Sequence, residues 1–339
     1  MDDEDDYQSG CRMCKKLSAL LPSIVAWGLL LGCTLAFYLI MAPALALPDR
    51  WGKIALVVVG VDGVLFLLVL SNLVMAMCID PGIHPMATFS EEQAGSEDFR
   101  SPLYKNVVIN GISVRMKWCV TCKFYRPPRA SHCSVCNRCI DNFDHHCPWV
   151  HNCVGWRNYR YFFFFLLALS AHMIYVCVVC LIFVFNRQST PDRCVLMKVY
   201  PSEIQCAVDP PFLCGCVLIL MTVLLSIPVV GLTIFHLVLV LRGRSTNEQV
   251  TGKFQSGFNP FTRGWIYNCF FTLCHSQQPA FEGYNPRKSQ GGDKAKRKKK
   301  LRTKVLVSDE TSVLYVPDAD GKDGHIRLKQ LRGSDSDSV

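Results

Sequence analysis

The sequence predicts an α-helical membrane protein with four transmembrane helices and a small cysteine-rich module between the second and the third helix. Three observations carry this prediction: four long apolar segments, an uneven distribution of lysine and arginine between them, and a run of cysteine and histidine residues mid-chain. Half of the 339 residues are hydrophobic, which would also suit a large soluble domain. The distribution of these residues therefore decides the fold class.

Four apolar segments are long enough to cross a bilayer, because a helix rises about 1.5 Å per residue and the hydrocarbon layer is about 30 Å thick. In chain order they are 17–41, 54–79, 161–185 and 212–241. The first follows the acidic opening 2-DDEDD-6, has no small-residue cleavage pattern and is too long for the core of a signal peptide. We expect it to be retained as a transmembrane helix.

Lysine and arginine are concentrated on one side of these segments. The number of lysines and arginines is three in residues 1–16, two in 42–53, ten in 80–160, three in 186–211 and eighteen after residue 241. Since positively charged segments stay in the cytosol, both termini and the middle segment are predicted to be cytosolic. The expected organisation is a cytosolic N-terminus (1–16), two helices (17–79), a cytosolic module (80–160), two helices (161–241), a juxtamembrane element (242–284) and a basic disordered tail (285–339).

The basic character of the chain does not require nucleic acid. The formal net charge is +9, and much of it lies in 294-KAKRKKKLRTK-304. In a chain held at a membrane, this run is expected to be attracted to anionic lipid, by about 1 kcal/mol per basic residue near the surface. The alternative is a solvated tail without a partner.

The middle segment is rich in metal-ligand residue types. Seven of the nineteen cysteines lie in a segment assigned to the reducing cytosol, where disulfides are disfavoured. With four histidines they give eleven candidates: Cys119, Cys122, His132, Cys133, Cys136, Cys139, His145, His146, Cys147, His151 and Cys153. Repeated C-x-x-C spacing predicts tetrahedral zinc sites, which would stabilise a module too small for a deep core. Two closed sites use eight ligands, so at least three groups remain.

Three adjacent residues form a candidate catalytic group. Asp144, His145 and Cys147 place a carboxylate, an imidazole and a thiol within four residues. An activated thiol nucleophile usually has two neighbours: a base that takes its proton and an acid that orients the base. On spacing alone, the alternative is a zinc module whose spare thiol has no catalytic role.

This stretch and its setting resemble the DHHC family of protein S-acyltransferases (palmitoyltransferases), and the resemblance covers most of the chain to about residue 275. Asp80-Pro81-Gly82 resembles the DPG motif of that family. Ser245-Thr246-Asn247-Glu248 resembles its TTxE motif, with serine in place of the first threonine. Asn268 resembles the asparagine of its C-terminal element.

The segments 115-RMKWC-119 and 124-FYRPPR-129 are similar to members with long cytosolic tails at the plasma membrane and Golgi, so one of these membranes is expected. The resemblance also implies a role for each ligand candidate. Cys147 is the nucleophile, His145 its base and Asp144 the group that orients the base, whereas His151 has no role. One zinc ion is bound by Cys119, Cys122, His132 and Cys139, and the other by Cys133, Cys136, His146 and Cys153.

The implied activity is transfer of a fatty acyl group, palmitoyl by resemblance, from acyl-CoA to cysteines of substrate proteins through a thioester on Cys147. The fatty chain is expected to enter a cavity among the helices, since each CH₂ kept from water contributes about 0.8 kcal/mol. His172, about 16 Å along the third helix, is the candidate for its floor; the alternative is a hydrogen bond to Asp62. Arg126 and Arg129 are candidates for binding the CoA phosphates, or else solvated arginines.

The implied partners are membrane-associated or membrane-spanning proteins with cytosolic cysteines; whether an accessory subunit is needed stays open. Asp337-Ser338-Val339 suits a PDZ-type domain, which binds a terminal carboxylate and an apolar side chain. Two other function classes compete. A non-enzymatic adaptor would use the zinc module alone and would tolerate loss of Cys147. A small transporter would explain Asp62 in the middle of the second helix, where an ionisable residue is costly.

Overall fold

The structure is a computed structural model that describes residues 2–47, 52–87, 103–188, 195–200, 203–207, 209–254, 259–276, 279–281, 313–315 and 325–327. The chain divides into two units, Met1–Tyr284 and Asn285–Val339. In the described part of the second unit, β10 (Val313–Tyr315) and β11 (His325–Arg327) form an antiparallel hairpin. The sequence did not predict these strands, and the basic run 294–304 lies outside the described residues.

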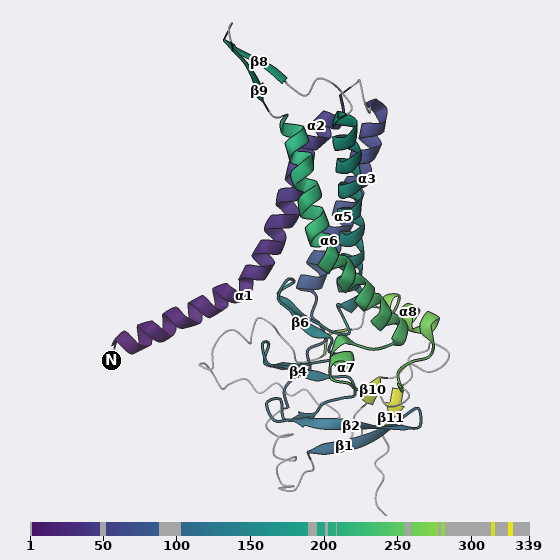
Figure 1. Ribbon diagram of the computed structural model, residues 1–339. Coiled ribbons are helices and arrows are strands. Elements are labelled where there is room, and N and C mark those ends of the chain that lie inside the picture. Colours follow the sequence, from purple (N-terminus) through teal and green to yellow (C-terminus); the bar gives the residue numbers. More distant parts are fainter. Residues whose placement is uncertain are drawn as a thin grey trace, which may run out of the picture. The chain divides into compact units, whose positions relative to one another are not determined.

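The described part of the chain contains four helices long and apolar enough to cross a membrane: Ser18–Leu45, Gly52–Cys78, Tyr159–Asn186 and Pro210–Arg242. The first span combines most of α1 (Asp2–Ala36), a π-helical turn η1 (Phe37–Met41) and α2 (Ala42–Leu45), and the others correspond to α3 (Gly52–Cys78), α5 (Tyr159–Gln188) and α6 (Pro210–Arg242). The four predicted segments are confirmed, each within a few residues. Figure 1 shows α5 running between α3 and α6.

Polar side chains inside this bundle find partners on neighbouring helices, because no water is available there. Ser170 of α5 bonds Thr233 of α6 at 2.9 Å, and His172 of α5 bonds Asp62 of α3 at 3.1 Å. The hydroxyl of Tyr175 donates to the Val58 carbonyl at 2.9 Å. These contacts fix α5 against both neighbours.

The module between α3 and α5 is built from short hairpins. β1 (Tyr104–Ile109) and β2 (Ile112–Cys119) are joined at Asn110-Gly111, whose φ angles of 49° and 78° are those that a tight hairpin turn needs. The Asn-Gly pair is the sequence signal for such a hairpin. β3 (Phe124–Tyr125) extends the same sheet, and two further hairpins follow: β4 (Ser131–Cys133) with β5 (Arg138–Ile140), and β6 (His145–Cys147) with β7 (Asn152–Val154). A separate hairpin, β8 (Val195–Tyr200) with β9 (Glu203–Ala207), lies between α5 and α6.

Two asparagines attach the β6–β7 hairpin to the last turn of α3. The Asn152 amide donates to the carbonyls of Ala76, Met77 and Ile79 at 3.0–3.2 Å. The Asn158 amide donates to Ala76 at 3.1 Å and to the β7 carbonyl of Cys153 at 2.8 Å. A helix ends with unpaired carbonyls, so these amides satisfy groups that would otherwise lack partners.

The Asp80-Pro81-Gly82 motif closes the same junction. Asp80 accepts hydrogen bonds from the N–H groups of Gly82 and Ile83 and forms an ion pair with Arg157 at 2.9 Å. The backbone of Gly155 lies so close that a Cβ there would be 2.6 Å from the Pro81 carbonyl oxygen. Only glycine fits at this position, and the module is thereby held tightly against the end of α3.

After α6 the chain folds back onto the module through α7 (Thr246–Val250) and α8 (Trp265–Leu273). Asn268 of α8 is 3 % exposed, and its amide donates to the Leu241 carbonyl near the end of α6 at 3.0 Å. Gly243, with φ 62°, ends α6, and a Cβ there would lie 3.0 Å from the Asn268 amide nitrogen. The asparagine singled out in the sequence therefore caps α6 and fixes where α7 begins.

Candidate active site and metal centres

The structure gathers the first predicted ligand set at one point. Cys119, Cys122, His132 and Cys139 have ligand atoms within 4.8 Å of one another. The three sulfurs lie 3.6, 3.6 and 3.8 Å from Nδ1 of His132. In a tetrahedral zinc site with Zn–S of about 2.3 Å and Zn–N of about 2.0–2.1 Å, sulfur and nitrogen ligands are about 3.6 Å apart. The geometry fits a zinc ion.

The second set is gathered in the same way. Cys133, Cys136, His146 and Cys153 also lie within 4.8 Å of one another. Nδ1 of His146 is 3.5 Å from the sulfur of Cys136 and 3.5 Å from that of Cys153. The chain therefore has two Cys₃His clusters that could hold zinc, which would supply folding energy to a module whose other buried apolar groups are few.

The β6–β7 hairpin separates metal ligands from the remaining groups. Side chains alternate between the two faces of a strand, so His146 points to one face while His145 and Cys147 point to the other. His146 pairs directly with Cys153 on β7, its partner in the second cluster. His151 lies in the turn between the strands with φ 48° and belongs to neither cluster.

Cys147 faces the end of the helix bundle. It is 4 % exposed and packs in an apolar cluster with residues from α3, α5, α6 and its own β6–β7 hairpin: Leu73, Ala76, Val150, Val154, Tyr159, Phe162, Phe163, Leu166 and Val240. A thiol in this position meets apolar side chains on the bundle side. An acyl group attached to it could continue directly into the bundle.

His145 lies between Cys147 and Asp144. Its Nδ1 is 2.6 Å from Oδ2 of Asp144, whose side chain is 1 % exposed. Burial acts to lower the pKa of His145, but its hydrogen bonds with Asp144 and Cys147 outweigh this and raise the pKa to about 9. The imidazole is thus oriented by the carboxylate and is a strong proton acceptor for the thiol.

Asp144 is held by two partners. Burial alone would raise its pKa, but the hydrogen bond from His145 and the nearby charge lower it, so the carboxylate stays ionised. Its second oxygen accepts the backbone N–H of Thr246 at 2.8 Å. Thr246 is the first residue of α7, and an N–H at a helix start suits a carboxylate.

The Ser245-Thr246-Asn247-Glu248 motif therefore acts mainly through its backbone. The Ser245 hydroxyl accepts from the Glu248 N–H at 3.2 Å, and the Glu248 carboxylate accepts from the Ser245 N–H at 2.9 Å. This capping box forms with serine as well as with threonine. The departure from the family pattern at Ser245 leaves the contact to Asp144 in place.

Arg129 does not present a free guanidinium for phosphate. Its Nε and Nη2 donate to Glu248 at 2.8 and 2.7 Å, and Nη2 also donates to the Gly243 carbonyl at 3.1 Å. The Glu248 side chain is 1 % exposed. Breaking such a buried pair typically costs about 3–5 kcal/mol, so we reassign Arg129 from CoA binding to fixing α7 on the module.

Arg126 has a different environment. It lines a hollow of about 330 Å³ together with Arg115, Lys117 and Lys253, and the Arg129–Glu248 pair also belongs to the lining. The Nε of Arg126 has no hydrogen-bond partner among the described residues. Since Glu248 pairs with Arg129, the other four cations around the hollow would attract a polyphosphate.

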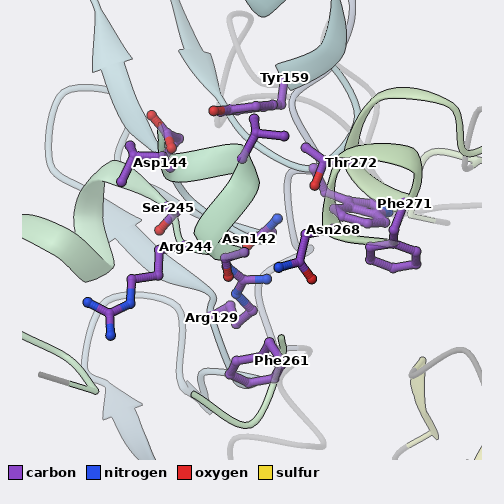
Figure 2. Close-up of a pocket in the computed structure, with 14 residues that line it drawn as sticks. Arg129, Asn142, Asp144, Tyr159, Arg244, Ser245, Phe261, Asn268, Phe271 and Thr272 are labelled. Carbon is purple, nitrogen blue, oxygen red and sulfur yellow. The ribbon is translucent and has the colours of Figure 1, made fainter. Parts of the chain in front are cut away.

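A second, smaller cavity lies behind Asp144, between α7 and α8. Figure 2 shows Arg129, Asn142 and Asn268 around it. Its volume of about 30 Å³ has room for one or two water molecules and for no larger group.

The sequence analysis missed His236, which lies on α6 and is 1 % exposed. Its ring centre is 5.9 Å from that of His145, and its ligand nitrogen lies within 4.8 Å of Asp144 and His145. A signal was present, because a histidine within an apolar segment is as unusual as Asp62 or His172. That signal did not reveal which group it would meet.

Comparison with known proteins agrees with this site. Residues 112–253 match the family model of DHHC palmitoyltransferase. The chain is 46 % identical over 275 residues to palmitoyltransferase ZDHHC8 of Drosophila melanogaster. This aligned region covers 81 % of this chain and 27 % of the relative. It is 47 % identical over 273 residues to palmitoyltransferase ZDHHC5-A of Danio rerio (80 % and 34 %) and 44 % identical over 335 residues to palmitoyltransferase ZDHHC5 of Rattus norvegicus (96 % and 41 %).

The match thus spans between about a quarter and two fifths of the length of these relatives. It includes all four membrane spans, both Cys₃His clusters and the Asp144–His145–Cys147 group. Residues 112–253 therefore form a DHHC palmitoyltransferase domain.

Proposed function

We propose that the chain is a protein S-acyltransferase that moves a fatty acyl group, palmitoyl in view of the names of its relatives, from acyl-CoA to cysteines of substrate proteins. One observation carries the proposal. His145 and Cys147 share the face of β6 that meets the helix bundle, whereas His146 faces away toward its metal cluster. The nucleophile and its base are therefore kept apart from the two Cys₃His clusters.

The reaction proceeds in two balanced steps. His145 takes the thiol proton of Cys147, and the thiolate attacks the acyl-CoA carbonyl. The bond to the CoA sulfur breaks, and CoA leaves with the proton from His145. A substrate cysteine then loses its proton to His145 and attacks the Cys147 thioester, and Cys147 leaves as the thiol. Each step exchanges one thioester for another, so the acyl group stays near one energy level.

The rest of the site supports these steps. Asp144 holds His145 in the tautomer with a proton on Nδ1 and stabilises the imidazolium. The apolar side chains around Cys147 exclude water, which would hydrolyse the thioester. The two zinc ions, when bound, would supply structural stability only.

The orientation and the partners are part of the same proposal. The basic flanking segments support a cytosolic module and cytosolic termini. The Golgi or the plasma membrane is proposed because 115–119 and 124–129 are similar to family members at these membranes. Substrates would be membrane-associated or membrane-spanning proteins with cytosolic cysteines. Anionic lipid near 294–304 is proposed on sequence grounds.

The first prediction tests the nucleophile. We expect Cys147→Ser to abolish self-acylation by palmitoyl-CoA, because a serine hydroxyl forms no thioester, while zinc stays near two ions per chain. The measurement is hydroxylamine-sensitive labelling of purified protein, with metal analysis on the same sample. Labelling that persists in the variant would reject Cys147 as the residue that carries the acyl group.

The second prediction separates the adjacent histidines. We expect His145→Ala to slow acyl transfer by about 10²-fold or more with metal retained, since a general base typically contributes 10²–10⁴-fold. His146→Ala should lose about one zinc ion and destabilise the module. Metal content, thermal unfolding and single-turnover acylation distinguish the two. The reverse pattern would mean that the two roles are exchanged.

The third prediction concerns the CoA phosphates. Because charge-assisted hydrogen bonds to phosphate are strong, Arg126→Glu should raise the KM for palmitoyl-CoA by about tenfold or more, with a smaller change in kcat. Arg138→Glu is the matched control, since it makes the same change of charge at a partly exposed arginine of β5 that does not line the hollow. Equal effects of both variants would indicate a general loss of positive potential instead of a binding site.

The fourth prediction concerns the floor of the acyl cavity. The His172–Asp62 hydrogen bond places a polar pair across α3 and α5, and an apolar chain end should stop at such a pair. His172→Ala should lengthen the cavity and shift preference toward longer donors in a competition of fourteen-, sixteen- and eighteen-carbon acyl-CoAs. Asp62→Asn, which preserves size and a hydrogen bond, should keep the original preference. If His172→Ala loses stability without changing preference, the floor lies elsewhere.

A further inference from the structure

The active site contains a second buried imidazole that the two steps above do not use. His236 projects from α6 next to His145, with 5.9 Å between ring centres and an angle of 42° between ring planes. It does not belong to either Cys₃His cluster. A buried polar side chain needs a hydrogen-bond partner, and the partner of His236 indicates the role of this side chain.

That partner is the hydroxyl of Tyr159, which lies 3.1 Å from Nδ1 of His236. Tyr159 is the first residue of α5, is 8 % exposed and packs in the same cluster as Cys147. The hydrogen bond therefore joins α5 to α6 beside the nucleophile. Tyr159 and His236 are called the Tyr159–His236 pair below.

Phe162 completes the surroundings of the catalytic imidazole. Its ring meets His145 edge-on at 5.1 Å and 69°, and it meets His236 at 5.2 Å and 76°. The three rings thus pack against one another. His236 cannot rotate away while Tyr159 holds its Nδ1, and Phe162 cannot move into the space that His236 fills.

We propose that the Tyr159–His236 pair positions His145 for the proposed acyl transfer. The hydrogen bond that His145 donates to Asp144 fixes one atom of the His145 ring, Nδ1, and leaves the ring free to tilt about that point. Contact with His236 and Phe162 removes the tilt, so that Nε2 stays directed at the sulfur of Cys147. Both residues of the pair are positioning residues that act through His145.

The inference rests on the proposed function, but it can be tested without an acyl donor. The rate at which iodoacetamide alkylates Cys147 reports how well His145 activates the thiol, and peptide mass spectrometry resolves this cysteine from the others. The protein is the full-length chain, purified with its zinc. Tyr159→Phe removes only the hydroxyl, and His236→Phe keeps a ring of similar size without Nδ1.

We expect each variant to slow alkylation of Cys147 about fivefold to tenfold, the size expected for loss of one hydrogen bond from the arrangement. In self-acylation, kcat should fall by a similar factor while KM for palmitoyl-CoA stays unchanged, and zinc should remain near two per chain. In a His145→Ala background, neither variant should cause a further decrease, since the pair acts through His145.

Thr233→Val is the matched control. It removes the Ser170–Thr233 hydrogen bond, which also joins α5 to α6 but does not contact His145. It should leave Cys147 alkylation within about twofold of the original rate, even if it lowers the unfolding temperature by an amount typical of one buried hydrogen bond.

Three results would overturn the inference: unchanged alkylation in both pair variants, an equal further loss in the His145→Ala background, or the same loss in Thr233→Val. If His236→Phe loses zinc, the milder Tyr159→Phe and its combination with His145→Ala decide the question. Failure of the original protein to self-acylate would instead reject the proposed function, and the alkylation result would stand separately.

Discussion

Side chains alternate between the two faces of β6, and the division between structure and chemistry in this protein depends on that alternation. Consecutive residues of a strand point in opposite directions, so His146 and its neighbours His145 and Cys147 cannot serve the same site. The pairing of His146 with Cys153 fixes which face is which. A shift of register by one residue would turn Cys147 toward the second Cys₃His cluster and His146 toward the bundle. Metal binding by His146 and Cys153 would therefore also fix the direction in which His145 and Cys147 point.

A strand of three residues has little stability alone, so its position must come from its surroundings. Asn152 and Asn158 connect β7 to the last carbonyls of α3, and Asp144 receives the first N–H of α7. These bonds link the hairpin to α3, the membrane helix before the module, and to α7, the short helix that follows the membrane helix α6. Movement of α3 relative to α6 would therefore act directly on Asp144 and, through it, on His145.

Much of this arrangement could be predicted from the sequence. Hydropathy predicts the four spans because a bilayer imposes a minimum length, and Asn110-Gly111 predicts its hairpin because few residues accept its φ angles. The resemblance to a family provides the two ligand sets, which spacing alone left open. These features are encoded within short stretches of chain.

Features that depend on distant partners could not be predicted in this way. Arg129 suits phosphate binding as well as any exposed arginine does, and only its contact with Glu248, 119 residues later, shows that its charge is already paired. The same holds for His236, which meets Tyr159 across 77 residues. Local sequence gives the type of side chain, whereas the fold determines which of several suitable partners it meets.

The polar contacts of α5 follow a pattern that bears on where an acyl chain can lie. At the module end α5 bonds to α6 through Tyr159 and His236, and further along it bonds to α6 again through Ser170 and to α3 through His172. Each such contact holds two helices together at one depth in the bundle. An apolar chain is not stabilised by packing against these polar groups. Between the first contact and the deeper ones, the side chains that α5 contributes to the cluster around Cys147, such as Phe163 and Leu166, are apolar. Polar contacts on α5 thus bound an apolar interval that begins beside Cys147 and ends at Ser170 on the side of α6 and at His172 on the side of α3.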